Sequence, residues 1–169
     1  MEDFGILLQP AQPLSADLAE RELLNCGFRF AGEGSLPRER TYVLCDDTKN
    51  IEALLKYDAA NEAMASYLSI RYAVCQPKSA TEAFLDVVGY IAEKFCLQIT
   101  GLAPGVEFSC HTLGEFGEYT WEKVKRAKSR WSSLFAGDTE EVVVSVAESW
   151  KYFAVKHPEV FRSGPLSVK

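Results

Sequence analysis

Residues 67–100, YLSIRYAVCQPKSATEAFLDVVGYIAEKFCLQIT, contain two kinds of hydrophobic repeat in succession. From Leu68 onward apolar residues alternate with other residues, and this period of two predicts a strand with one buried face. After Pro77 the apolar residues recur at helical spacing through residue 95. Residues 97–100 favour a second strand. We therefore expect a strand, a helix and a strand, with a right-handed crossover if the two strands are parallel.

Local signals extend this core in both directions. Ser79 and Glu82 form a capping-box pattern at the start of the central helix, and Ser15 is suited to cap a shorter helix. Further strands are expected at residues 4–9, 26–31 and 41–45, and further helices at 16–25 and 48–60.

The C-terminal third has a different pattern. Residues 102–119 are rich in glycine and predict a long loop, after which Thr120 can cap a helix that ends at Ala136. A second capping-box pattern predicts a last helix over 138–157, packed on the previous one as a hairpin. The expected fold is a single α+β domain spanning 1–169. It has a mixed sheet of about five strands, helices packed on the sheet and a C-terminal helical hairpin.

Composition narrows the class of protein. The N-terminus lacks the basic and long apolar regions of a signal peptide, and no segment approaches the roughly 20 apolar residues of a membrane helix. We therefore expect a cytoplasmic protein that does not enter a membrane. No cysteine pair has the spacing of a zinc site, so neither a metal nor a cofactor is expected. The cysteines are Cys26, Cys45, Cys75, Cys96 and Cys110.

Charge is unevenly distributed along the chain, whose net charge is -6. Residues 1–118 hold 18 acids and 9 bases, whereas residues 119–136 hold 1 acid and 5 bases. An acidic surface disfavours nucleic acid as a partner and favours a basic protein.

Few residues suggest catalysis. Cys110 and His111 are neighbours, and adjacent side chains in an extended segment point apart, which disfavours a catalytic pair. Asp46 and Asp47 follow a predicted strand and could bind a cation, although a turn and capping role is commoner for aspartate. No phosphate-binding or dinucleotide-binding glycine motif occurs. A binding role therefore ranks above an enzymatic one.

The segment GEFGEYTWE, residues 114–122, is the main candidate for a partner-binding surface. Its aromatic residues alternate with acids near glycines, as in an interface hot spot and its rim. The alternative is that the aromatic residues anchor a loop to the core. The residues chosen for partner binding are Glu115, Phe116, Glu118, Tyr119 and Trp121, followed by Asp46 and Asp47.

Residues 68–102, LSIRYAVCQPKSATEAFLDVVGYIAEKFCLQITGL, resemble the strand, proline, helix and strand core of small bacterial proteins, including immunity proteins of interbacterial toxin systems. The resemblance implies a protein that neutralises a cognate basic toxin by direct binding. The alternative is a small enzyme or ligand-binding domain with a pocket near Cys110, His111, Asp46 and Asp47. A homo-oligomeric subunit is a third reading, which a large exposed apolar patch would favour.

Overall fold

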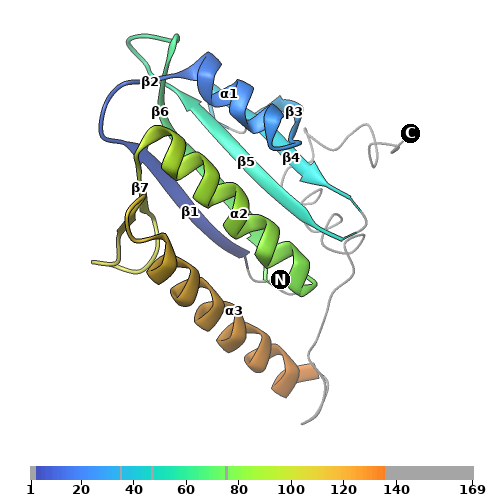
Figure 1. The fold of residues 1–169 in the computed structure, drawn as a ribbon. Coiled ribbons are helices and arrows are strands. Elements are labelled where there is room, and N and C mark those ends of the chain that lie inside the picture. Colours follow the sequence, from blue (N-terminus) through green and yellow to red (C-terminus); the bar gives the residue numbers. More distant parts are fainter. Residues whose placement is uncertain (1–2, 35, 47, 75, 136–169) are drawn as a thin grey trace.

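The computed structural model describes residues 3–34, 36–46, 48–74 and 76–135. These residues form one antiparallel sheet and three helices (Figure 1). The α+β class predicted from the sequence is therefore confirmed. In chain order the elements are β1 (Asp3–Pro10), β2 (Leu14–Ser15), α1 (Ala16–Asn25), β3 (Arg29–Glu33), β4 (Glu39–Cys45), β5 (Asn50–Tyr57), β6 (Met64–Ala73), α2 (Lys78–Phe95), β7 (Leu97–Thr100), β8 (Phe108–Ser109) and α3 (Leu113–Phe135).

The sheet has eight strands within the described residues, in the order β3-β4-β5-β6-β1-β7-β8, with β2 paired to β6. Every pairing is antiparallel. The predicted mixed sheet of about five strands is wrong in strand number and in the direction of pairing. Strands β2 and β8 have two residues each, too few to give an alternating pattern. Because β6 and β7 both pair with β1, they run parallel to each other, and α2 connects them across β1.

One face of the sheet carries the hydrophobic core. Tyr42, Ala53, Ile70 and Ile6 lie in one row across β4, β5, β6 and β1, and each is at most 2% exposed. Helices α1 and α2 lie over this face (Figure 1), and Phe84 of α2 is fully buried against it. The buried face predicted for β6 from its alternating residues is therefore confirmed, and so is the buried side predicted for α2 from its helical spacing.

The helix predicted over 48–60 is wrong, because most of these residues form the central strand β5. Its sequence, NIEALLKY, contains strong helix formers. As a strand, however, it places Ile51 and Leu55 on the core face, where both are 0% exposed. On the opposite face, Glu52 forms an ion pair with Arg71 of β6 at 2.5 Å. Burial and cross-strand pairing outweigh helix propensity here.

Helix α3 begins at Leu113, inside the segment predicted as a loop over 102–119. The amide of Phe116 donates to the carbonyl of Thr112 at 3.0 Å, which starts the helical hydrogen-bond ladder. Thr120, predicted to cap the helix, lies inside it and is buried. Two glycines in the first two turns have low helix propensity and obscured this start in the sequence.

Of the two N-terminal helix caps predicted in the described residues for α1 and α2, one is confirmed and one is wrong. Ser15 caps α1 as expected, since its side chain accepts a hydrogen bond from the first turn. The capping box of Ser79 and Glu82 is wrong, because no side chain caps α2 and the Ser79 hydroxyl donates to the Thr48 carbonyl. The last predicted helix, 138–157, and hence the hairpin, lies outside the described residues. No helix in the described ranges is long and apolar enough to cross a membrane.

Candidate functional site

The segment GEFGEYTWE forms the first turns of α3. A helical backbone places alternate residues on different sides, so it separates the aromatic side chains that the sequence pattern had grouped. Phe116 faces the core and is 1% exposed. Its ring centroid lies 6.4 Å from that of Phe84 and 5.6 Å from that of Phe108. Phe116 therefore anchors α3 to the core.

Tyr119 and Trp121 are half-buried, two residues apart on a helix and therefore on different flanks of α3. The Tyr119 ring lies 5.5 Å from that of Phe108, and the ammonium of Lys123 lies 5.2 Å from it. The ammonium of Lys78 lies 5.7 Å from the Trp121 ring. Each ring already has a cation–π contact, and each keeps part of its surface open to a partner.

Glu115 and Glu118 are exposed, and they belong to a larger acidic set. Between residues 79 and 122 the chain holds seven acids and one base. That base, Lys94, is engaged by Glu22 of α1 at 2.9 Å. Every one of the seven acids is exposed; three lie on α2, one lies just before β8 and three lie on α3. We call this set the acidic surface: Glu82, Asp86, Glu93, Glu107, Glu115, Glu118 and Glu122.

Asp46 lies in the turn between β4 and β5. Its Oδ1 accepts hydrogen bonds from the amides of Thr48 at 2.8 Å and Lys49 at 3.1 Å, and the Lys49 ammonium pairs with its other oxygen. Desolvation raises the pKa of Asp46, but these hydrogen bonds outweigh it and lower the pKa to about 2. The carboxylate therefore stabilises the turn, as the sequence favoured. Asp47 lies outside the described residues.

Among the described residues, the polar groups proposed for a small-molecule pocket do not converge. The turn that contains Asp46 lies at the start of α2, where the Ser79 hydroxyl contacts the Thr48 carbonyl. Cys110 lies at the other end of α2, where it contacts Cys96. Since α2 has 18 residues, it is about 27 Å long. One small ligand cannot contact both ends.

A cavity of about 870 Å³ lies elsewhere. It is lined by Phe4, Val74 and residues of α3 between Glu122 and Arg130. Asp46, Cys110 and His111, the polar residues predicted for the pocket that the structure describes, do not line it. The described residues therefore do not form the pocket on which the hypothesis of a small enzyme or ligand-binding domain was based.

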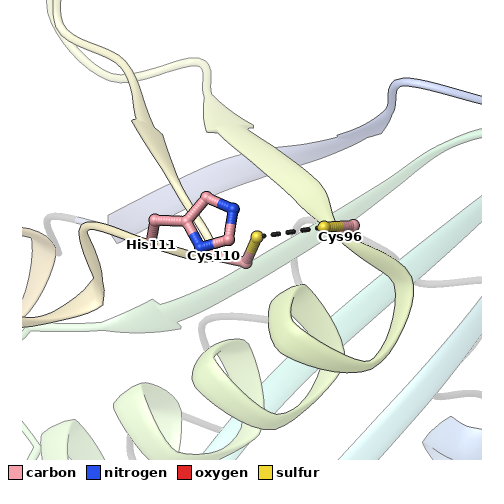
Figure 2. A group of neighbouring side chains, drawn as sticks. All are labelled: Cys96, Cys110 and His111. Carbon is pink, nitrogen blue, oxygen red and sulfur yellow. Dashed lines mark hydrogen bonds between the residues drawn. The ribbon is translucent and has the colours of Figure 1, made fainter.

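Cys110 and His111 instead form a cluster with Cys96 (Figure 2). The ligand atoms of the three side chains all lie within 4.8 Å of one another, and the two Sγ atoms are 3.2 Å apart. Cys110 and His111 occupy the middle of a turn between β8 and α3. A hydrogen bond closes this turn, in which the Thr112 amide donates to the Ser109 carbonyl at 3.0 Å. The expectation that their side chains point apart assumed an extended backbone. The turn brings them together.

The environment of Cys110 does not activate it as a nucleophile. Hydrogen bonding to Cys96, burial and the negative charge of Glu93 raise the pKa of the Cys110 thiol. The thiolate is the nucleophilic form, so a raised pKa disfavours covalent catalysis by a Cys110–His111 pair.

Sequence reasoning missed Cys96 as a member of the cluster. It lies 14 residues before Cys110, a longer interval than the ligand spacing of a zinc motif. One feature of the sequence could have indicated Cys96: it is a cysteine directly after an amphipathic helix, where glycine is the usual residue.

Comparison of the chain with protein-family models, with curated proteins and with solved structures finds no match. A functional proposal for this chain is therefore argued from its geometry, charge and residue chemistry.

Proposed function

We propose that the protein binds a basic protein partner through its acidic surface and acts as an immunity-type inhibitor that neutralises a cognate bacterial toxin. The observation that carries the proposal is the exposure of all seven acids between residues 79 and 122, a stretch with Lys94 as its one base. The inhibitory role follows the resemblance of residues 68–102 to bacterial immunity proteins.

The acids of this surface differ in how far they are neutralised. Within the described residues, Glu82 is paired with Lys78 at 3.0 Å, and Glu122 is paired with Arg126. The other five acids have no ion pair in the described part of the chain: Asp86, Glu93, Glu107, Glu115 and Glu118. Their charges are available to attract a cationic partner and to increase its rate of association.

The aromatic residues have unequal roles in this proposal. Tyr119 and Trp121 keep exposed surface on the flanks of α3 and supply apolar contact. Phe116 is buried and supports the surface from within. Asp46 is committed to its turn, so it adds charge near the start of α2 and forms no part of the central contact.

The test is affinity capture from a lysate of the source organism at low and moderate salt, with two charge-reversal variants of equal net charge. The variant Glu115→Lys/Glu118→Lys changes the acidic surface. The control Glu33→Lys/Glu62→Lys changes two acids that are 72% exposed, Glu33 in β3 and Glu62 between β5 and β6. Their contacts to arginines are 3.8 and 3.4 Å long. We expect the wild type and the control to retain one stoichiometric basic protein, and the first variant to lose it.

Two results would contradict the proposal. One is that no protein is retained at either salt. The other is that both variants retain the same protein equally, which would place the contact away from the acidic surface. Inhibition is tested next, by adding the wild type to the captured partner in an assay of growth arrest.

A further inference from the structure

We propose that Cys96, Cys110 and His111 form a binding site for a thiophilic divalent metal ion of the zinc class. The proposal is independent of the acidic surface and of any protein partner. It rests on the distances between the three side chains, on their donor chemistry and on the backbone that holds them.

The distances suit a small coordination sphere. Zinc binds cysteine sulfur at about 2.3 Å and histidine nitrogen at about 2.0 to 2.1 Å, which in a tetrahedral arrangement places the ligand atoms about 3.5 to 3.8 Å from one another. The three ligand atoms here lie within 4.8 Å of one another, and the sulfurs are 3.2 Å apart. Small side-chain rotations would therefore place all three around one ion.

The donor set selects the class of metal. Two thiolates and an imidazole favour zinc and other thiophilic ions over magnesium or calcium, which prefer oxygen ligands. A disulfide between Cys96 and Cys110 would use the two sulfurs alone. A metal ion uses these and also His111, which lies in the same cluster (Figure 2).

The backbone holds the ligands before any ion binds. Cys96 ends α2 in the left-handed conformation, with φ 54° and ψ 47°, a position that glycine usually occupies. A side chain is unfavourable in this conformation, and residues in such strained positions cluster at functional sites. On the other segment, the Ser109 amide donates to the Thr112 hydroxyl at 2.9 Å, and the His111 amide donates to the Ser109 hydroxyl at 3.2 Å.

Three protein ligands leave a fourth coordination position. Cys96 and His111 are exposed and Cys110 is half-buried, so this position faces solvent. Water or a group from another molecule can complete the coordination. The ion would also join the end of α2 to the turn before α3.

The test uses the purified full chain, reduced with a phosphine that does not bind metals and titrated with Co²⁺ as a spectroscopic substitute for zinc. We expect one ion per chain, with thiolate-to-cobalt charge-transfer absorption and the visible bands of tetrahedral cobalt, and displacement of both by zinc. Cys96→Ser, Cys110→Ser and His111→Ala should each lose most of this absorption. Cys26→Ser, which removes a half-buried cysteine elsewhere, should keep it.

Circular dichroism and thermal unfolding of each variant separate loss of ligand from loss of fold. Folded variants that lose the cobalt spectrum support the site. The proposal is overturned if the wild type gives no stoichiometric cobalt spectrum, or if His111→Ala gives the same spectrum as the wild type. It is also overturned if air-exposed protein loses two hydrogens by mass at these cysteines while the reduced protein binds no metal.

Discussion

The carboxylate of Glu22 in α1 lies 2.9 Å from the ammonium of Lys94 at the end of α2, and the Glu22 side chain is 2% exposed. The Tyr90 hydroxyl donates to the same carboxylate at 2.8 Å, and the Asn25 amide donates at 3.1 Å. The hydrogen bond from Lys94, with those from Asn25 and Tyr90, lowers the pKa of Glu22 from 4.5 to about 2. This network joins the two helices that cover the core.

Glu22 should therefore make the fold sensitive to acid. Because its pKa is lower in the folded state than in the unfolded chain, its contribution is fully present above about pH 4.5 and is lost as the pH falls toward 2. Glu22→Gln should lower the free energy of unfolding at pH 7 and reduce the difference between pH 7 and pH 3 in urea unfolding. The exposed control Glu93→Gln should change neither quantity much. An unchanged difference in Glu22→Gln would show that the network does not persist in solution.

Phe116 should act as a core residue. Phe116→Ala removes a ring that is 1% exposed, and truncations of this kind cost about 3 to 5 kcal/mol of unfolding free energy. Phe30→Ala removes a ring that is 50% exposed and should cost less than half as much. Urea unfolding of both variants checks the order. Equal, small losses would mean that Phe116 is more accessible than its packing against Phe84 and Phe108 indicates.

Cys96→Gly should stabilise the protein while it removes a metal ligand. Glycine adopts the left-handed conformation at the end of α2 without the cost that a side chain incurs, so the unfolding free energy should rise by about 1 kcal/mol in metal-free buffer. Cys96→Ala keeps the side-chain cost and should leave stability nearly unchanged. If glycine and alanine gave the same stability, the left-handed conformation of residue 96 would be contradicted.

Gln76 should stabilise the connection between β6 and α2. Its side-chain oxygen accepts from the Asn50 amide at 2.6 Å, and its side-chain nitrogen donates to the Asn50 carbonyl at 2.8 Å. Gln76 is 0% exposed, so Gln76→Leu would leave two buried backbone groups unpaired and cost about 2 to 4 kcal/mol. Thermal and urea unfolding measure this loss. The exposed Gln98→Leu serves as control and should have little effect.

The sequence predicted the fold best where local pattern and burial agree. β6 alternates buried and less buried residues around Leu68 and Ile70, and α2 buries one helical side that includes Phe84 and Ile91. Both patterns are long enough to be read without knowledge of their neighbours. Strand β5 was missed because its residues favour a helix, and only its neighbours β4 and β6 make it a strand.

The candidate sites could be predicted only in part, for a related reason. Local composition indicated that Glu115 and Glu118 belong to the surface, and both are exposed. A loop was expected where α3 forms, so Phe116 was chosen as a partner-binding residue although it is buried. The contact between Cys96 and Cys110 depends on the pairing of β7 with β8 and on two turns. No short motif encodes that combination.

The most direct test of the proposed function is the association rate between the purified chain and its captured basic partner at two ionic strengths. Raising the ionic strength from about 0.01 M to about 0.15 M shortens the screening length from about 30 Å to about 8 Å. The wild type and Glu33→Lys/Glu62→Lys should both associate more slowly at the higher salt. Glu115→Lys/Glu118→Lys should already be roughly tenfold slower at low salt. A rate that is the same for all three proteins and independent of salt would contradict the role of the acidic surface.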